Sequence, residues 1–148
     1  MASGVKVTEE CITTYNNMYK DKKIRYAVFV ISNGEIAVET VKDKEGTYDE
    51  FLEDLCKMDG NDEDCRYGLF DYEYTFNPQG AENIKKSKIF LILWAPENAK
   101  VKKKMLYSSS FDALKKAFVG VAKYIQANDK SDCEQQAVED VLRATDRN

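Results

Sequence analysis

The sequence of 148 residues contains no histidine. This absence excludes Ser-His-Asp and Cys-His catalytic arrangements, mixed Cys/His zinc sites and the commonest general base at neutral pH. The seven glycines form neither a G-x-x-x-x-G-K-S/T nor a G-x-G-x-x-G pattern, which excludes the usual phosphate-binding loops. Carboxylate pairs such as Asp49 and Glu50 are explained by the solvation of an exposed helix face. We therefore expect the chain not to be an enzyme and to need no cofactor.

Long apolar runs and closely spaced cysteines are also missing. No segment approaches the roughly 18 apolar residues of a membrane span, and the first residues contain no apolar signal region. The acidic segment 59–64 lacks the glycine and glutamate positions of a calcium loop, so we expect an exposed turn and no metal site. The four cysteines have no C-x-x-C spacing and are typical of buried apolar groups in a cytosolic protein: Cys11, Cys56, Cys65 and Cys133. We expect a cytoplasmic protein with access to the nucleus.

The charges are unevenly distributed along the chain. The whole sequence has a net charge of −4, whereas residues 85–123 contain ten lysines against Glu97 and Asp112, a net charge of +8. A basic block in an acidic chain indicates an acidic partner that contacts one face of the molecule. Proteins that bind duplex nucleic acid usually have a basic domain overall, so we expect no nucleic-acid partner.

Hydrophobic periodicity predicts three helices besides the one described below. The first begins at Thr8 and extends to about Lys20. The other two follow capping-box patterns, Thr47-x-x-Glu50 and Ser131-x-x-Glu134, in which two side chains and two backbone amides bond reciprocally. Residues 1–7 are expected to form a flexible N-terminal segment.

Four strands are predicted, at residues 26–31, 35–41, 65–76 and 88–94, and Asn33-Gly34 indicates a tight hairpin between the first two. The pattern at residues 123–127 is compatible with either helix or strand. The order of elements predicts an α/β fold, a mixed sheet flanked by helices on both faces. No linker divides the chain, so we expect a single domain over residues 1–148.

The segment from Trp94 to Phe118 predicts a long helix with two distinct faces. Pro96 and Asn98 indicate its start, with Asn98 as the capping residue. At about 100° per residue, one broad arc is apolar and is expected to be buried: Leu106, Tyr107, Phe111, Ala113, Leu114, Ala117, Phe118 and Val121. The opposite face is expected to be exposed: Val101, Lys104, Met105, Ser108, Asp112 and Lys115, with Lys102 at its margin.

Two features of this helix do not favour stability. Met105 lies on the exposed face among lysines, where the core does not need it. Lys102, Lys103 and Lys104 lie in the first turns, where the helix dipole disfavours each cation by about 0.3–1 kcal/mol. We interpret this face as a binding surface. The alternative is a solvated lysine face with one stray methionine.

Several blocks of the sequence are similar to the actin-depolymerising factor/cofilin family. They span nearly the whole chain in the family's order: Met1-Ala-Ser-Gly-Val5, Tyr48-Asp-x-Phe-Leu52, Asp64-Cys-Arg-Tyr-Gly-Leu-Phe-Asp71, Trp94-Ala-Pro-Glu97 and Lys102-x-Lys-Met-x-Tyr-x-Ser-Ser-x-Asp-Ala113. The resemblance implies the actin-depolymerising-factor homology (ADF-H) fold and a strand after Gly120. It also implies binding to monomeric and filamentous actin, preferentially ADP-loaded, with filament severing and depolymerisation. We expect a mostly monomeric protein at the cytoskeleton.

The resemblance also implies the residues that bind. The surface for monomeric and filamentous actin would include Ser3, Gly4, Val5, Lys102, Lys104, Met105 and Ser110. A second, filament-specific surface would include Lys86, Lys88, Asp140 and Arg143, although the two lysines also have a simpler explanation as protection of a strand edge. Ser3 would be a regulatory phosphorylation site, and the basic face would bind phosphoinositides in competition with actin.

Three alternatives remain open at this point. The first is a protein of the same fold that binds filaments, or a branching complex, without severing. The second is a phosphoinositide-binding module for which actin is incidental. The third is an enzyme acting on a small molecule.

Overall fold

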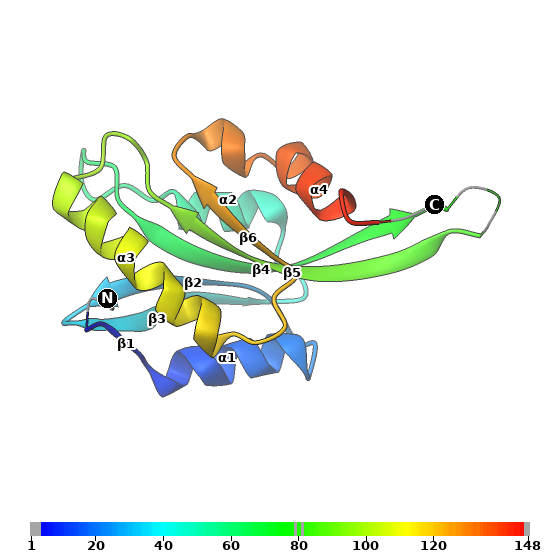
Figure 1. The fold of residues 1–148 in the computed structure, drawn as a ribbon, viewed down its shortest axis with the longest axis horizontal. Coiled ribbons are helices and arrows are strands. Elements are labelled where there is room, and N and C mark those ends of the chain that lie inside the picture. Colours follow the sequence, from blue (N-terminus) through cyan, green and yellow to red (C-terminus); the bar gives the residue numbers. More distant parts are fainter. Residues whose placement is uncertain (1–3, 79, 81, 147–148) are drawn as a thin grey trace.

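A mixed six-stranded sheet with helices on both faces forms the protein, as the sequence predicts (Figure 1). The computed structural model describes residues 4–78, 80 and 82–146. Helices α1 (Glu9–Tyr19) and α3 (Val101–Ala117) cover one face, and α2 (Tyr48–Leu55) and α4 (Gln135–Arg143) cover the other. The strand order is β1-β3-β2-β4-β5-β6. The strands are β1 (Lys6–Val7), β2 (Ile24–Ser32), β3 (Glu35–Asp43), β4 (Arg66–Phe76), β5 (Ile84–Trp94) and β6 (Lys123–Ala127).

The hairpin between β2 and β3 has the predicted turn. Asn33 and Gly34 have φ values of 53° and 77°, which match the positive φ that a two-residue hairpin turn needs at both positions. The structure also assigns two segments that the sequence analysis leaves open or predicts wrongly. Residues 123–127 form β6, parallel to β5, and Lys6 and Val7 pair in parallel with β3 and so are not part of a flexible segment. Both pairings depend on partners distant in sequence.

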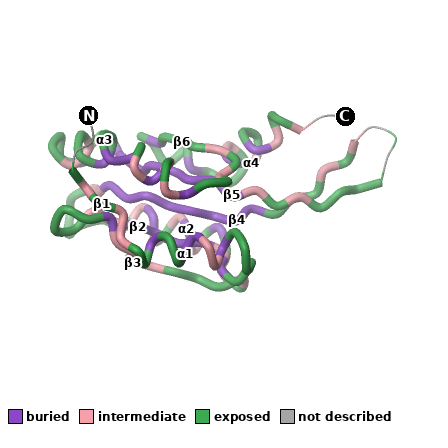
Figure 2. Tube along the Cα trace, turned by 60° about the horizontal axis from the view of Figure 1, so that its bottom comes forward, coloured by how far each residue is buried: buried purple, intermediate pink, exposed green. Residues whose placement is uncertain are grey.

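The sheet separates two apolar cores. One core joins α1 and α3 to the sheet, and the other joins α2, α4 and the 3-10 helix η1 (Lys130–Cys133) to its opposite face. Residues on the central strands are therefore buried on both faces, as the purple segments of Figure 2 show. Burial on both faces explains continuous apolar runs such as residues 89–94. In a strand with one face in water, only every second residue would be apolar.

Beyond Phe70 and Phe90, strands β4 and β5 pair only with each other among the described residues, at positions 71–76 and 84–89. This two-stranded projection, called the arm below, extends past the rest of the sheet and is more exposed than the sheet centre (Figures 1 and 2). Lys86 and Lys88 lie on this arm, within reach of the end of α4.

Two predicted helix caps are wrong. The residue that caps α3 is Lys100, not Asn98, and it makes no side-chain capping bond. Ser131 does not cap the last helix either, because Asp129 and Asp132 form a capping box that begins η1, and α4 follows Glu134. The Thr47–Glu50 box is confirmed, with the Glu50 amide donating to Thr47 Oγ1 at 3.2 Å and the Thr47 amide to Glu50 Oε1 at 2.9 Å.

These caps give a direct test of the fold. We expect Thr47→Ala to lower the free energy of unfolding by about 1 kcal/mol, because it leaves a helix amide without its acceptor. For a domain of this size that corresponds to roughly 2–4 °C in Tm. Ser131→Ala, at the cap that the sequence suggests and the structure does not use, should leave Tm unchanged in the same thermal unfolding experiment. Equal losses in the two variants would contradict the capping described here.

Candidate functional site

Helix α3 is held in place from its inner side. The Tyr107 hydroxyl accepts a hydrogen bond from the Ile31 amide of β2 at 2.8 Å, and the Tyr67 hydroxyl of β4 donates to the Tyr107 carbonyl at 2.5 Å. Tyr107, Phe111 and Leu114 are each at most 2% exposed. Because these contacts determine the rotation of the helix about its axis, they also determine which side chains face outward.

The outward face carries two large apolar side chains. Val101 and Met105 are each 66% exposed, so the predicted exposure of both is confirmed. Two predictions about neighbouring positions fail. Leu106, expected in the core, is 37% exposed, whereas Ser110, expected to contact a partner, is 1% exposed. Ser110 lies three residues after Tyr107 and four before Leu114, on the buried stripe, and we exclude it from the surface.

The lysines at the start of α3 have different environments. Lys103 forms an ion pair with Asp64, at 2.5 Å, and Lys104 donates to the Glu97 carbonyl at 2.8 Å. The side chain of Lys102 is exposed and forms no ion pair or hydrogen bond within the described part of the chain. The first turn contains no acidic residue and no capping side chain. The first amides of α3 and the cation of Lys102 are therefore available to acidic groups of a partner.

The N-terminal segment lies beside this helix. Strand β1 contacts α3, and Val5 and Val7 pack against the core that contains Tyr107 and Phe111. Gly4 is exposed and has a φ of 84°, a conformation that side chains rarely adopt. Ser3 lies outside the described residues. Because β1 lies beside α3, we group six residues of the two segments under the name α3 surface: Gly4, Val5, Val101, Lys102, Lys104 and Met105.

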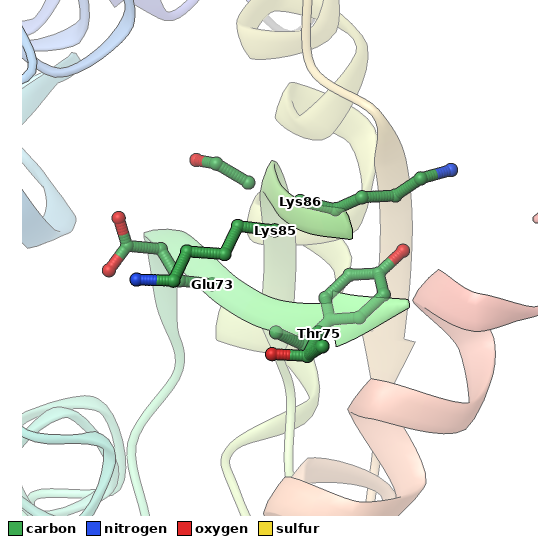
Figure 3. Close-up of a pocket in the computed structure, with 6 residues that line it drawn as sticks. Glu73, Thr75, Lys85 and Lys86 are labelled. Atoms are coloured by element: carbon green, nitrogen blue, oxygen red, sulfur yellow. The ribbon is translucent and has the colours of Figure 1, made fainter. Parts of the chain in front are cut away.

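A second group of charged residues joins the arm to the C-terminal end of α4. Lys86 and Lys88 lie opposite Tyr74 and Tyr72 in the β4–β5 pairing and share their face of the arm. Asp146 accepts hydrogen bonds from Lys86 at 2.6 Å, from Lys88 at 3.1 Å and from the Tyr74 hydroxyl at 2.5 Å. Figure 3 shows that Lys86 and its neighbour Lys85 leave the strand on opposite faces, with Lys85 extending toward Glu73.

Helix α4 contributes the other charges of this group. The Arg143 side chain donates to Glu139 at 2.7 Å and lies over the Tyr74 ring, 4.5 Å from its centroid. Asp140 is exposed and accepts a hydrogen bond from Gln136 at 2.9 Å. The four residues predicted for a second surface therefore lie on two adjoining elements, and we call them the arm surface: Lys86, Lys88, Asp140 and Arg143.

The protonation states of the arm are determined by these contacts. Burial alone would raise the pKa of Asp146, but the hydrogen bonds from Lys86, Tyr74 and Lys88 outweigh it and hold this pKa well below its usual range. The hydrogen bond from Tyr72, followed by that from Arg143, lowers the pKa of Glu139 despite some burial. Burial and the bond to Glu139 raise the pKa of Tyr72 to about 12. Tyr72 is therefore a neutral donor at physiological pH.

Sequence reasoning missed the residues that organise the arm. Asp146 lies beyond the last apolar residue of the α4 pattern, and no local signal distinguishes it from a solvated acid. On the opposite face of the arm, Asp71 is 0% exposed and accepts hydrogen bonds from Lys44 at 2.8 Å and Ser87 at 2.5 Å. A charged residue inside an otherwise apolar strand pattern was the available signal for Asp71, because a buried carboxylate requires cationic or hydrogen-bonding partners.

A shallow hollow of about 290 Å³ on the arm is lined by Glu73, Tyr74, Thr75, Lys85, Lys86 and Ser87. Within the described ranges no group of three or more acidic or cysteine side chains is placed to hold a metal ion. The described helices are all too short or too polar to cross a membrane.

Comparison with known proteins places this domain in a family. Residues 4–143 match the family model described as cofilin/tropomyosin-type actin-binding protein. The chain therefore belongs to the cofilin and actin-depolymerising factor family of actin-binding proteins, as the sequence resemblance indicates.

Individual relatives agree with this assignment. Cofilin of Mycosarcoma maydis is 38% identical and is aligned over 98% of this chain and 99% of its own. Actin-depolymerizing factor 3 of Zea mays is 35% identical over 95% and 96% of the two chains. The crystal structure of Streptomyces griseoflavus cofilin superposes with a TM-score of 0.79 at 36% identity, covering 94% of this chain and 97% of that one. The ADF-H fold is thereby confirmed.

The Asp146 contacts predict a pH dependence of stability. A carboxylate whose pKa is depressed by folding contributes stability above its unfolded pKa of about 3.9, and this contribution is lost as the pH falls through the folded pKa. We expect the free energy of unfolding, measured by urea titration between pH 7 and pH 2, to decrease less steeply below pH 4 in Asp146→Asn. The variant should also be less stable than wild type at pH 7.

Asp140→Asn is the matched control, because Asp140 is an exposed acid on the same part of the chain, and among the described residues its side chain accepts a hydrogen bond from Gln136 and forms no ion pair. Below pH 4, its free energy of unfolding should decrease with falling pH as steeply as that of wild type. If Asp146→Asn also retains the wild-type slope, the described network does not stabilise the folded state.

Proposed function

We propose that this protein binds monomeric and filamentous actin and that it severs and depolymerises the filaments. The observation that carries the proposal is the α3 surface, where the exposed side chain of Met105 lies beside Lys102 and Lys104 at a helix start without acidic residues. An apolar anchor bordered by cations fits a partner with an apolar cleft and an acidic rim. The Zea mays relative is an actin-depolymerizing factor by name, which supports the same activity.

The proposed mechanism is differential binding and involves no catalysis. The α3 surface contacts one actin subunit, and the arm surface contacts a neighbouring subunit that is present only in a filament. If both contacts form only in a strained or twisted filament, the protein increases the population of that state and weakens the bonds between subunits. The distinct positions of the two surfaces support this division, since the arm projects beyond the body that carries α3 (Figure 1). If ADP-loaded subunits adopt this twisted state more readily, the protein binds them preferentially.

Two regulators fit the same surface. Phosphate on Ser3 would add about −1.5 to −2 charges to the segment that continues into Gly4 and Val5, and would repel an acidic partner. Phosphoinositide headgroups would bind the lysines of the +8 block and compete with actin. We place this work in the cytoplasm, at the cytoskeleton, by a mostly monomeric protein that enters the nucleus in complex with actin.

Exchange of the apolar anchor for a cation tests the proposal. Met105→Lys should weaken co-sedimentation with filaments and binding to monomers by tenfold or more, because a buried charge replaces an anchor of roughly 2 kcal/mol. Filament severing, followed by fluorescence microscopy, should be lost with it. Binding to vesicles that contain phosphoinositide should be retained, since the positive charge of the surface increases.

Val119→Lys is the matched control, because Val119 is also exposed, at 76%, but follows the C-terminal end of α3, at the opposite end of the helix from Lys102. It should bind and sever as wild type does. Wild-type binding without severing would favour the first alternative, a protein of this fold that only decorates filaments. Vesicle binding without actin binding in the wild type would favour the phosphoinositide module.

The regulatory role of Ser3 has its own test. Ser3→Glu places a negative charge next to Gly4 and should weaken binding to monomeric actin by about tenfold, whereas Ser3→Ala should bind as wild type does. Binding can be measured by the fluorescence of labelled monomeric actin. If Ser3→Glu binds with wild-type affinity, charge at this position does not regulate the interaction.

A further inference from the structure

Two of the four cysteines, Cys56 and Cys133, border one cavity. Cys56 is the residue that ends α2, and Cys133 is the last residue of η1. Both line a cavity of about 380 Å³, together with Leu52, Glu53, Lys130 and Glu134. Cys133 is 1% exposed and Cys56 is partly exposed, so one sulfur faces the core and the other can meet small molecules that enter the cavity.

The backbone holds the two thiols in this position. The Cys56 amide donates to the Leu52 carbonyl at 2.9 Å, and the Tyr48 hydroxyl donates to the Cys133 carbonyl at 2.5 Å. The second bond joins the start of α2 directly to η1. With both elements fixed, the two side chains border the same cavity, and each thiol affects the acidity of the other. A disulfide between the two sulfurs would cross this cavity and join α2 to η1.

The two thiols differ in acidity. The interaction with the Cys133 thiol, assisted by the charges of Lys130 and Arg66, lowers the pKa of Cys56, although burial and Glu63 oppose this. The same interaction and burial raise the pKa of Cys133. The partly exposed sulfur is thus the one that favours the thiolate, which is the reactive form, and the buried sulfur retains its proton.

The other two cysteines lack these properties. Cys11 is buried and donates to the Ile36 carbonyl at 3.2 Å, and burial raises its pKa. Burial raises the pKa of Cys65 to about 11. Neither shares a contact with a second thiol among the described residues.

We propose that Cys56 and Cys133 are a peroxide-sensitive thiol pair that closes to a disulfide between α2 and η1. The Cys56 thiolate attacks one oxygen of hydrogen peroxide, so that an S–O bond forms, the O–O bond breaks and hydroxide leaves. The Cys133 sulfur then attacks the Cys56 sulfenic acid, the S–S bond forms, and the hydroxyl leaves with the Cys133 proton as water. In sum, two thiols and one peroxide give one disulfide and two waters.

The disulfide would change the protein in a defined way. It would close a loop from residue 56 to residue 133 that contains β4, β5, α3 and β6, and long closed loops restrict the unfolded chain most strongly. It would also join α2 covalently to the segment that leads into α4, which carries Asp140 and Arg143 of the arm surface. In a reducing cytosol the bond would be reversible.

The test uses the full-length protein and dilute hydrogen peroxide, and does not require actin. Peptide mapping without reductant should recover the Cys56 and Cys133 peptides linked to each other, in a monomer, and dithiothreitol should separate them. The oxidised protein should melt at a higher temperature than the reduced protein. Recovery of unlinked Cys56 and Cys133 peptides, or of covalent dimers only, would overturn the proposal.

Single substitutions assign the two roles. In Cys133→Ser, Cys56 should stop at the sulfenic acid and become labelled by dimedone. In Cys56→Ser, Cys133 should resist peroxide. Cys65→Ser, the control, should still form the disulfide. Oxidation of Cys133 in Cys56→Ser at the wild-type rate would contradict the assigned order of attack, and reduced variants are compared by thermal unfolding to verify that each is folded.

Discussion

Burial of β4 and β5 on both faces is the constraint on which the rest of the structure depends. Strands that are apolar on both sides must be covered twice, so α1 and α3 pack on one face and α2 and α4 on the other. Strands β4 and β5 extend beyond their pairing with β2 and β6, and this extension is the arm, against which the C-terminal end of α4 packs. The separation of the two candidate surfaces follows from this extension.

Helix α3 combines strong tertiary anchoring with unfavourable local chemistry. Its inner side is held by hydrogen bonds at Tyr107 and by the buried rings of Tyr107 and Phe111. Its start has no side-chain cap and no acid in the first turn, and Lys102 lies in the positive field of the helix dipole. A helix that tertiary contacts stabilise can tolerate these costs, of a few tenths to about 1 kcal/mol each, in a region that is available for a partner.

The arm shows the opposite arrangement, because its charges are satisfied within the molecule. Lys86 and Lys88 bond to Asp146, and Arg143 bonds to Glu139. Any filament contact through these residues must therefore exchange internal ion pairs for intermolecular ones. Lys102 is exposed and has no ion pair among the described residues, so a contact through Lys102 requires no such exchange.

The sequence by itself determined the class of fold, the hairpin at Asn33-Gly34, the Thr47–Glu50 cap and the exposure of Met105. Each depends on periodicity or on bonds within a few residues, and such signals are encoded locally. Only the tertiary structure decided the burial of Ser110, the capping of η1 by Asp129 and the pairing of β1 with β3. It also decided the partners of Asp146 and the cavity that Cys56 shares with Cys133. Lys86 and Asp146 are 60 residues apart. Their meeting depends on where α4 packs against the sheet, and no pattern around either residue encodes that position.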